Sequence, residues 1–210
     1  MSRTRDAETY DRLLEVAARL FAARGFKDVT IREICRAARA NVAAVNYHFG
    51  DKLGLYREVL NKAIETMQAT TEAARQAGTG LEAEQKLRAY VRVFLERTAA
   101  QASDAWIHQL MLREMADPTP AIELVFEQVI RPRVAYLSEI VAAVLDIDAN
   151  DVQVLRSVMS IQSQCHAAMP NPLSKRLMHN LAADVTFDDL AEHIAQFSLG
   201  GLSAVARQTT

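Results

Sequence analysis

The stretch that decides the fold runs from Thr30 to Asp51 and reads TIREICRAARANVAAVNYHFGD. It opens with a capping box, because Glu33 follows Thr30 at the spacing that lets each side chain bind the other's backbone N–H. We therefore expect a short helix from residue 31 to about Ala38. Asn41 is a good N-cap residue and predicts a second short helix over residues 42–48. Two short helices joined by a turn of three or four residues predict a helix-turn-helix.

Long amphipathic segments flank this motif on both sides. The segment over residues 6–24 repeats apolar side chains at helical spacing and stops at Gly25, a common residue after a helix C-cap. Asp51 is placed to cap a long helix that ends near residue 76. The first helix and the motif are expected to enclose a small core made of Leu13, Ala17, Leu20, Phe21, Val29, Ile34, Val45 and Phe49.

The rest of the chain also predicts helices. Seven Gly and five Pro make up 12 of 210 residues, about half the usual share, and half of all residues are apolar. Further helices are expected over residues 81–100, 104–115, 152–169 and 187–207, with a short one after Pro172. The last of these opens with Thr186 and Asp189, which resemble a capping box with Asp in place of Glu. We expect Pro120 at the first position of a helix behind Thr119, and a kink at Pro132. The expected fold class is all-α, with a first domain over residues 1–50 and a second over residues 51–210.

The second short helix carries residue types that suit a DNA major groove. Small side chains at residues 42–44 let the backbone come close to base edges, and Asn46 can form two hydrogen bonds with adenine. Tyr47 and His48 can donate to phosphates at the groove rim, and Lys52 adds a cation. The expected DNA-contacting residues are Thr30, Val42, Ala43, Ala44, Asn46, Tyr47, His48 and Lys52.

The charge distribution favours the same end of the chain. Residues 1–60 carry 11 Lys and Arg against 8 Asp and Glu, a net charge of +3, whereas the other 150 residues carry 13 against 18, a net −5. A polyanion is therefore expected to bind the N-terminal part. The alternative is an ordinary three-helix packing unit that binds no DNA.

Residues 8–60 resemble the TetR family of bacterial transcriptional regulators. The resemblance is carried by Thr30–Tyr56, and above all by the triplet Tyr47-His48-Phe49 followed by Lys52. Segments 112–120 and 129–133 are similar to the CecR-like branch of that family. The resemblance implies a homodimer whose N-terminal domains bind a palindromic operator and whose helical C-terminal domain binds a small-molecule effector.

The turn of the motif departs from the family pattern, because Arg39 stands where the family usually has glycine. A turn of this kind often needs a residue with positive φ, which is strained for a residue with a Cβ. Arg39 is therefore expected to be strained or to belong to a turn displaced by one residue. It is also a candidate phosphate contact. The alternative is a solvated arginine in an ordinary right-handed conformation.

Two further sets of residues are expected to serve the second domain. Apolar side chains mixed with methionine and a few polar groups suit a small-molecule pocket, and the alternative is a plain core. The candidate pocket residues are Phe94, Trp106, His108, Met111, Met115, Phe126, Tyr136, Gln162 and Cys165. An apolar stripe beside two helix glycines predicts a dimer interface. Its candidate residues are Val158, Ile161, Leu190, Ile194, Phe197, Gly201 and Val205.

Nothing in the sequence points to enzyme chemistry. The five histidines show no metal-ligand spacing, and the adjacent Cys165 and His166 face different sides of a helix, so we expect no metal, no cofactor and no catalytic residue. Two distant cysteines, the absence of a signal sequence and the lack of an apolar run of membrane length predict a cytoplasmic protein without a membrane partner. The competing functions are a helical ligand-binding or scaffold protein without DNA affinity, and an α-helical hydrolase that uses Cys165 or a histidine.

Overall fold

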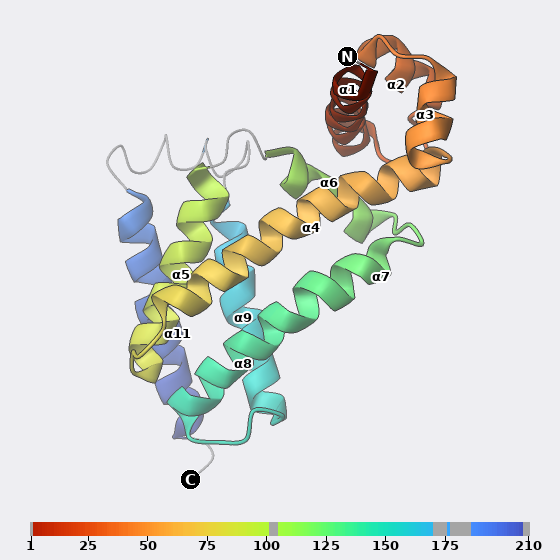
Figure 1. Cartoon of the computed structure of the whole chain (residues 1–210). Helices are drawn as coiled ribbons and strands as arrows, with labels where there is room; N and C mark the ends of the chain where they lie inside the picture. The colour runs from red at the N-terminus through yellow and green to blue at the C-terminus, as the bar shows by residue number, and fades with distance from the viewer. Residues whose placement is uncertain (1, 101–104, 170–175, 177–185, 208–210) are drawn as a thin grey trace. The chain divides into compact units, whose positions relative to one another are not determined.

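The computed structural model describes residues 2–100, 105–169, 176 and 186–207, and every regular element in these ranges is helical (Figure 1). This confirms the all-α prediction. The described elements are α1 (Ser2–Arg24), α2 (Ile31–Ala38), α3 (Val42–Phe49), α4 (Lys52–Ala77), α5 (Ala83–Ala100), α6 (Ala105–Ala116), α7 (Ile122–Val125), the π-helical turn η2 (Phe126–Ile130), α8 (Arg131–Leu145), α9 (Val152–Ala167) and α11 (Phe187–Ala206). In these ranges no helix is long and apolar enough to cross a membrane.

The chain forms two compact units. Unit 1 consists of Met1–Met67 and Ala102–Val129, and unit 2 consists of Gln68–Gln101 and Ile130–Thr210. Helix α4 therefore contributes its first part to unit 1 and its last part to unit 2. The sequence placed residues 51–210 in the second domain, whereas residues 105–129 of that range pack with the N-terminal helices. The division of function at residue 50 stays a prediction.

The core of unit 1 contains the apolar residues expected from the sequence. Seven of the eight predicted residues are buried, and Leu20 packs partly buried against them. Helix α1 contacts α2, α3 and α6, and α2 contacts α3. Because α2 and α3 have only eight residues each, this shared core rather than helix propensity holds them in place.

Helix α6 is fastened to unit 1 by polar contacts as well as by packing. The Glu114 side chain is only 2% exposed and accepts a hydrogen bond from the Tyr56 hydroxyl. Its other oxygen accepts from the backbone N–H and the hydroxyl of Thr119, at 3.2 and 3.1 Å. Arg113 donates through Nε to the carbonyl of Ala22, at 2.8 Å. A buried carboxylate is tolerated when its oxygens are hydrogen-bonded in this way.

Unit 2 is a bundle of α5, α8, α9 and α11 with the last part of α4. Helix α5 contacts α8, α9 and α11, and α8 contacts α9 and α11 (Figure 1). Its core is mainly aliphatic, with three aromatic side chains, Tyr90, Phe94 and Tyr136, from α5 and α8.

Four predicted helix caps are confirmed. Thr30 and Glu33 form the capping box of α2, and the side chain of Asn41 accepts from Ala44 N at the start of α3. Asp51 accepts from Gly54 N at the start of α4, at 2.7 Å. Thr186 caps α11 as expected from the sequence.

The proline predictions differ in their outcome. Helix α7 begins at Ile122 rather than at Pro120, because Thr119 binds the buried Glu114 and turns the chain before the helix starts. The π-helical turn η2 ends directly before α8, and Pro132 lies in the first turn of α8. The kink expected at Pro132 stays a prediction. The short helix expected after Pro172 lies outside the described residues.

Candidate nucleic-acid interface

Helix α3 buries one side and exposes the other. Val45 and Phe49 belong to the core of unit 1. The opposite side presents Ala43, Asn46 and Tyr47, and Tyr47 is 80% exposed. Val42 is exposed at the first position of the helix, on the side of Val45, whereas Ala44 and His48 are half-buried. The residues predicted to meet base edges and phosphates therefore form one continuous face.

Aromatic packing fixes the C-terminal end of α3. The ring of Tyr10 from α1 stacks on Phe49 at 4.8 Å and meets the edge of His48 at 5.8 Å. The Tyr10 hydroxyl donates to Glu58 Oε2 of α4, at 3.2 Å. His48 is thus held by its neighbours at the rim of the exposed face.

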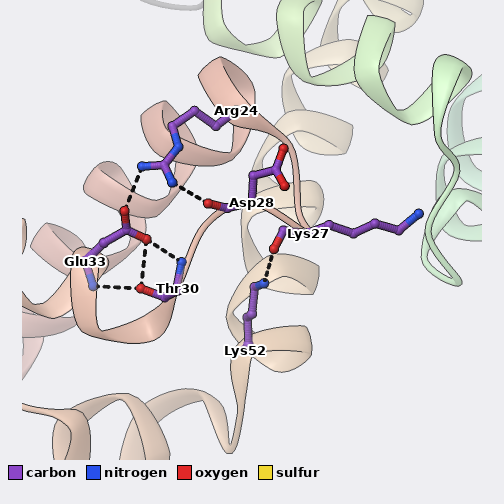
Figure 2. A network of polar contacts seen from close by, with 6 residues as sticks. All are labelled: Arg24, Lys27, Asp28, Thr30, Glu33 and Lys52. Atoms are coloured by element: carbon purple, nitrogen blue, oxygen red, sulfur yellow. Dashed lines mark hydrogen bonds and ion pairs between the residues drawn. The ribbon is translucent and has the colours of Figure 1, made fainter.

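The N-terminus of α2 is held by a compact polar network (Figure 2). The Glu33 carboxylate accepts from Thr30 N and from Arg24 Nη1, both at 2.8 Å, and Glu33 N donates to Thr30 Oγ1 at 3.3 Å. The Arg24 guanidinium and the Thr30 hydroxyl and N–H stabilise the ionised carboxylate and lower the pKa of Glu33 to about 2. The exposed turn in front of α2 is therefore well ordered.

Lys52 lies beside this turn (Figure 2). Its Nζ donates to the carbonyl of Lys27 at 3.4 Å and lies 4.4 Å from the centre of the Phe26 ring. Partial burial lowers the pKa of Lys52. Lys27 in turn pairs with Asp117 at 2.6 Å. The Lys52 cation thus holds the turn between α1 and α2, and its phosphate contact stays a prediction.

Arg39 ends α2 in the left-handed conformation, with φ 51° and ψ 45°. The alternative of an ordinary right-handed arginine is therefore wrong. Its backbone N–H bonds to the carbonyl of Arg36 at 3.3 Å, and its side chain is exposed. The backbone strain that the sequence predicted at Arg39 is therefore present in the fold.

The structure adds two cations that the sequence reasoning missed. Arg32 and Arg36 lie one turn apart on α2, on the exposed side opposite Ile34 and Cys35. Within the ranges that the structure covers, neither these two arginines nor Arg39 forms an ion pair. Their four-residue spacing on a polar helix face was the available signal. Three guanidinium groups without an ion pair in those ranges therefore accompany α3 on unit 1.

Two family models match the chain. The model described as "Bacterial regulatory proteins, tetR family" matches residues 13–59, which contain the helix-turn-helix. The model described as "HTH-type transcriptional dual regulator CecR, C-terminal domain" matches residues 83–202, more than half of the chain. The chain belongs to the TetR family of transcriptional regulators.

Similar proteins agree with this assignment. The HTH-type transcriptional dual regulator CecR of Shigella flexneri is 30% identical over 136 residues, and the match spans 61% of each chain. A TetR-family transcriptional regulator from Streptomyces coelicolor has a TM-score of 0.63 at 23% identity, over 96% of both chains. AibR, solved in complex with isovaleryl coenzyme A and operator DNA, has a TM-score of 0.65 at 18% identity, over 90% of this chain and 97% of its own.

The relatives also bear on the non-enzyme prediction. The families and the similar proteins are transcriptional regulators rather than enzymes, which supports that prediction. Among the described residues, no group of three His, Cys, Asp or Glu side chains could hold a metal ion.

The candidate pocket residues of this TetR-family chain are divided between the two units. Phe94, Tyr136, Gln162 and Cys165 lie in unit 2, whereas the other five belong to unit 1. Among those five, Trp106, His108 and Met111 are half-buried. Met115 and Phe126 are 69% and 45% exposed, so they do not line a buried pocket. Residues 105–129 pack with the N-terminal helices, and the effector pocket itself stays a prediction.

The four residues in unit 2 have a polar neighbour that the sequence reasoning missed. Arg133 of α8 is only 7% exposed, and its guanidinium lies 5.3 Å from the centre of the Phe94 ring. Its Nε donates to Thr71 Oγ1 at 3.4 Å. The Gln162 amide donates to the Tyr90 hydroxyl. We call Tyr90, Phe94, Arg97, Arg133, Gln162 and Cys165 the polar cluster of unit 2.

A cavity of about 260 Å³ lies beside Tyr136, also in unit 2. Arg75, Lys86 and Glu139 contribute charged side chains to its lining, together with the loop Gly78–Gly80. The Tyr136 ring is 6.2 Å from that of Tyr90. One aromatic layer thus connects the cavity with the polar cluster.

The candidate dimer-interface residues fall into a buried group and an exposed group. Val158, Ile161 and Ile194 are buried in the chain's own core, so their side chains form no exposed face. Leu190 and Val205 pack partly buried against that core. Phe197 and Gly201 are exposed on α11, and a Cβ built on Gly201 meets nothing within 4 Å. The structure adds Val152, Leu155 and Met159, which are exposed apolar residues on α9.

Proposed function

We propose that this chain is a homodimeric, cytoplasmic transcriptional repressor that binds a palindromic operator and is released from it by a small-molecule effector. In this proposal residues 1–50 bind DNA, and residues 51–210 bind the effector and the second subunit. The observation that carries the proposal is the exposed face of α3. Its apolar side is buried, while its opposite side presents small residues, an amide and an aromatic hydroxyl.

The proposed contacts follow from the chemistry of that face. Val42, Ala43 and Ala44 approach the base edges, and Asn46 binds adenine. Tyr47, His48 and Lys52 donate to phosphates, as does the N-terminus of α2 at Thr30. Arg32, Arg36 and Arg39 add cations whose charge no described carboxylate balances through an ion pair. Since phosphate neutralisation supplies much of the affinity for DNA, these arginines strengthen binding without reading sequence.

The proposed dimer uses the exposed apolar residues of α9 and α11. Val152, Leu155 and Met159 follow one another at helical spacing, and Phe197 is exposed on α11. Gly201 leaves open space where a second helix could approach closely. In a symmetric dimer, two copies of this apolar face bury each other. The two α3 helices can then bind the two halves of a palindrome.

The proposed effector site is the polar cluster of unit 2. It combines aromatic walls with a few buried polar groups, as small-molecule sites do. The solved relative AibR, in complex with an acyl coenzyme A and operator DNA, supports the pairing of an effector with DNA binding. Helix α4 contributes to both units, so it is the proposed route of coupling. The effector releases DNA only if it binds more tightly to the conformation with lower DNA affinity.

Footprinting on the DNA upstream of the chain's own gene tests the proposal. We expect a protected palindrome whose half-sites lie about one helical turn apart or a multiple of it. Tyr47→Ala should abolish the footprint. The control variant Met115→Ala removes another exposed apolar side chain, on α6 and outside the proposed DNA and dimer contacts, and should retain the footprint over the same range of protein concentration. Equal protection of unrelated DNA, or no protection at any concentration, would favour a helical scaffold or ligand-binding protein.

A further inference from the structure

A buried cation lies within unit 2. Arg133 is 7% exposed, although arginine is rarely buried to this extent. Burial lowers its pKa, and Tyr90 and Cys165 act on it in the opposite direction. Burial raises the pKa of Tyr90 and raises that of Cys165 to about 12, so both groups are neutral at pH 7. These two neighbours therefore contribute no negative charge.

Two polar atoms of the same cluster have no hydrogen-bond partner among the described residues. One is the donor Nε of Arg97, and the other is the acceptor Oε1 of Gln162. Arg97 follows Phe94 by three residues on α5, so both lie on the same face of the helix. Buried polar atoms without partners are rare in folded proteins, and they often mark a site that a ligand completes.

Aromatic side chains border these polar groups. Tyr90 and Phe94 stack at 6.1 Å between ring centres, and His166 of α9 meets the edge of Phe94 at 5.4 Å. The Gln162 amide already donates to Tyr90, which orients its Oε1 as an acceptor. The cluster thus offers cations, one acceptor and flat apolar surfaces.

We propose that the effector is a small organic acid, bound through its carboxylate by Arg133 and Arg97 and through a hydroxyl or N–H group by Gln162. This inference rests on the proposed function, because it names the ligand class of the same site. Guanidinium groups match the geometry of a carboxylate and form short, charge-assisted hydrogen bonds with it. A ligand N–H or O–H satisfies the Gln162 acceptor. The body of the acid packs against the aromatic surface that Tyr90 and Phe94 form.

Calorimetric titration of the full chain with paired acids and amides tests the inference. The probes are benzoate, 4-hydroxybenzoate, hexanoate and 3-hydroxyhexanoate, each compared with its neutral amide. We expect at least one acid to bind at least ten times more tightly than its amide. Arg133→Met and Arg97→Met should each weaken that acid tenfold or more. Arg92→Met, which removes an exposed arginine from the same helix as Arg97, should leave the affinity unchanged.

Two further variants separate a loss of ligand contacts from a loss of folding. Arg133→Lys retains the charge but not the two-pronged geometry, so its affinity should fall between those of the unaltered chain and Arg133→Met. Gln162→Leu should weaken 4-hydroxybenzoate while leaving benzoate unchanged. Circular dichroism confirms that each variant is folded before its titration is read.

Three results would overturn the inference: equal binding of acids and amides, unchanged affinity in folded Arg133→Met, or no binding of any acid in the panel. Operator binding is measured separately on the unaltered chain. If the chain binds its operator but none of the acids, the inference is refuted and the proposed function stands. If the chain binds the acids but no DNA, the proposed function is refuted.

Discussion

Replacing Arg39 by glycine should make the chain more stable and weaken its binding to DNA. Arg39 adopts φ 51° and ψ 45°, where a residue with a Cβ costs about 1–2 kcal/mol relative to the right-handed region. Glycine removes that cost but adds about 0.5–1 kcal/mol of conformational entropy to the unfolded chain. The net gain in the free energy of unfolding is therefore about 0–1.5 kcal/mol, or up to roughly 6 °C in melting temperature for a chain of this size.

Matched variants separate the backbone effect from the loss of charge. Arg39→Ala removes the guanidinium but keeps a Cβ in the left-handed region, so its stability should stay near that of the unaltered chain. Asp146→Gly relaxes another non-glycine residue with positive φ, at 55° in unit 2. That variant should gain less stability than Arg39→Gly, because aspartate tolerates the left-handed region better than arginine does. Its DNA affinity should not change.

The assays are thermal unfolding followed by circular dichroism, and operator binding followed by fluorescence anisotropy in a series of salt concentrations. If Arg39 contacts a phosphate, both Arg39→Gly and Arg39→Ala should reduce the slope of log affinity against log salt by about 0.9. A melting temperature of Arg39→Gly below that of the unaltered chain would refute the strain argument. Unchanged affinity and slope in both variants would refute the phosphate contact.

The remaining predictions concern α3, the start of α2 and the dimer. Asn46→Ala should cost about 1–3 kcal/mol on operator DNA and little on random DNA, because base contacts carry specificity; equal losses on both would show that Asn46 reads no base. The pKa of Glu33 is lowered to about 2 from 4.5, so its stabilisation is complete above pH 4.5 and is lost as the pH falls toward 2. The melting temperature of Glu33→Gln should lie below that of the unaltered chain at about pH 7 and approach it near pH 2, and a constant difference would contradict this. Gly201→Glu should yield a folded monomer in analytical ultracentrifugation, since the added side chain meets open space within one chain but is repeated across a symmetric interface; an intact dimer would place the interface elsewhere.

The helix-turn-helix was predictable because its signals are local. The capping residues and the spacing of Ile34, Val45 and Phe49 follow from short stretches of sequence, and the structure confirms them. The left-handed conformation of Arg39 was one of the alternatives that the sequence left open, and the structure decides in its favour. These interactions depend on residues close together in the chain, so their geometry is set by helix periodicity and side-chain chemistry.

Long-range packing was not predictable in the same way. Glu114 is buried because Tyr56 and Thr119 satisfy its oxygens, and no local pattern indicates a partner 58 positions away. The candidate pocket mixed residues of two units for the same reason. Arg133 was overlooked because an arginine between apolar residues in a helix is more often exposed. Ile161 and Ile194 matched the apolar stripe expected at a dimer interface. The sequence pattern alone does not show whether such a stripe packs in the chain's own core or against a second subunit.

Operator binding by the unaltered chain, measured by anisotropy in a series of salt concentrations, tests the central claim most directly. A labelled operator fragment is compared with a scrambled fragment of the same composition. The account predicts that log affinity falls linearly with log salt on both fragments, and that the operator is bound on the order of a thousandfold more tightly or better. Affinity that does not change with salt, or equal affinity for the two fragments, would contradict the assignment of α3 as a DNA-reading helix.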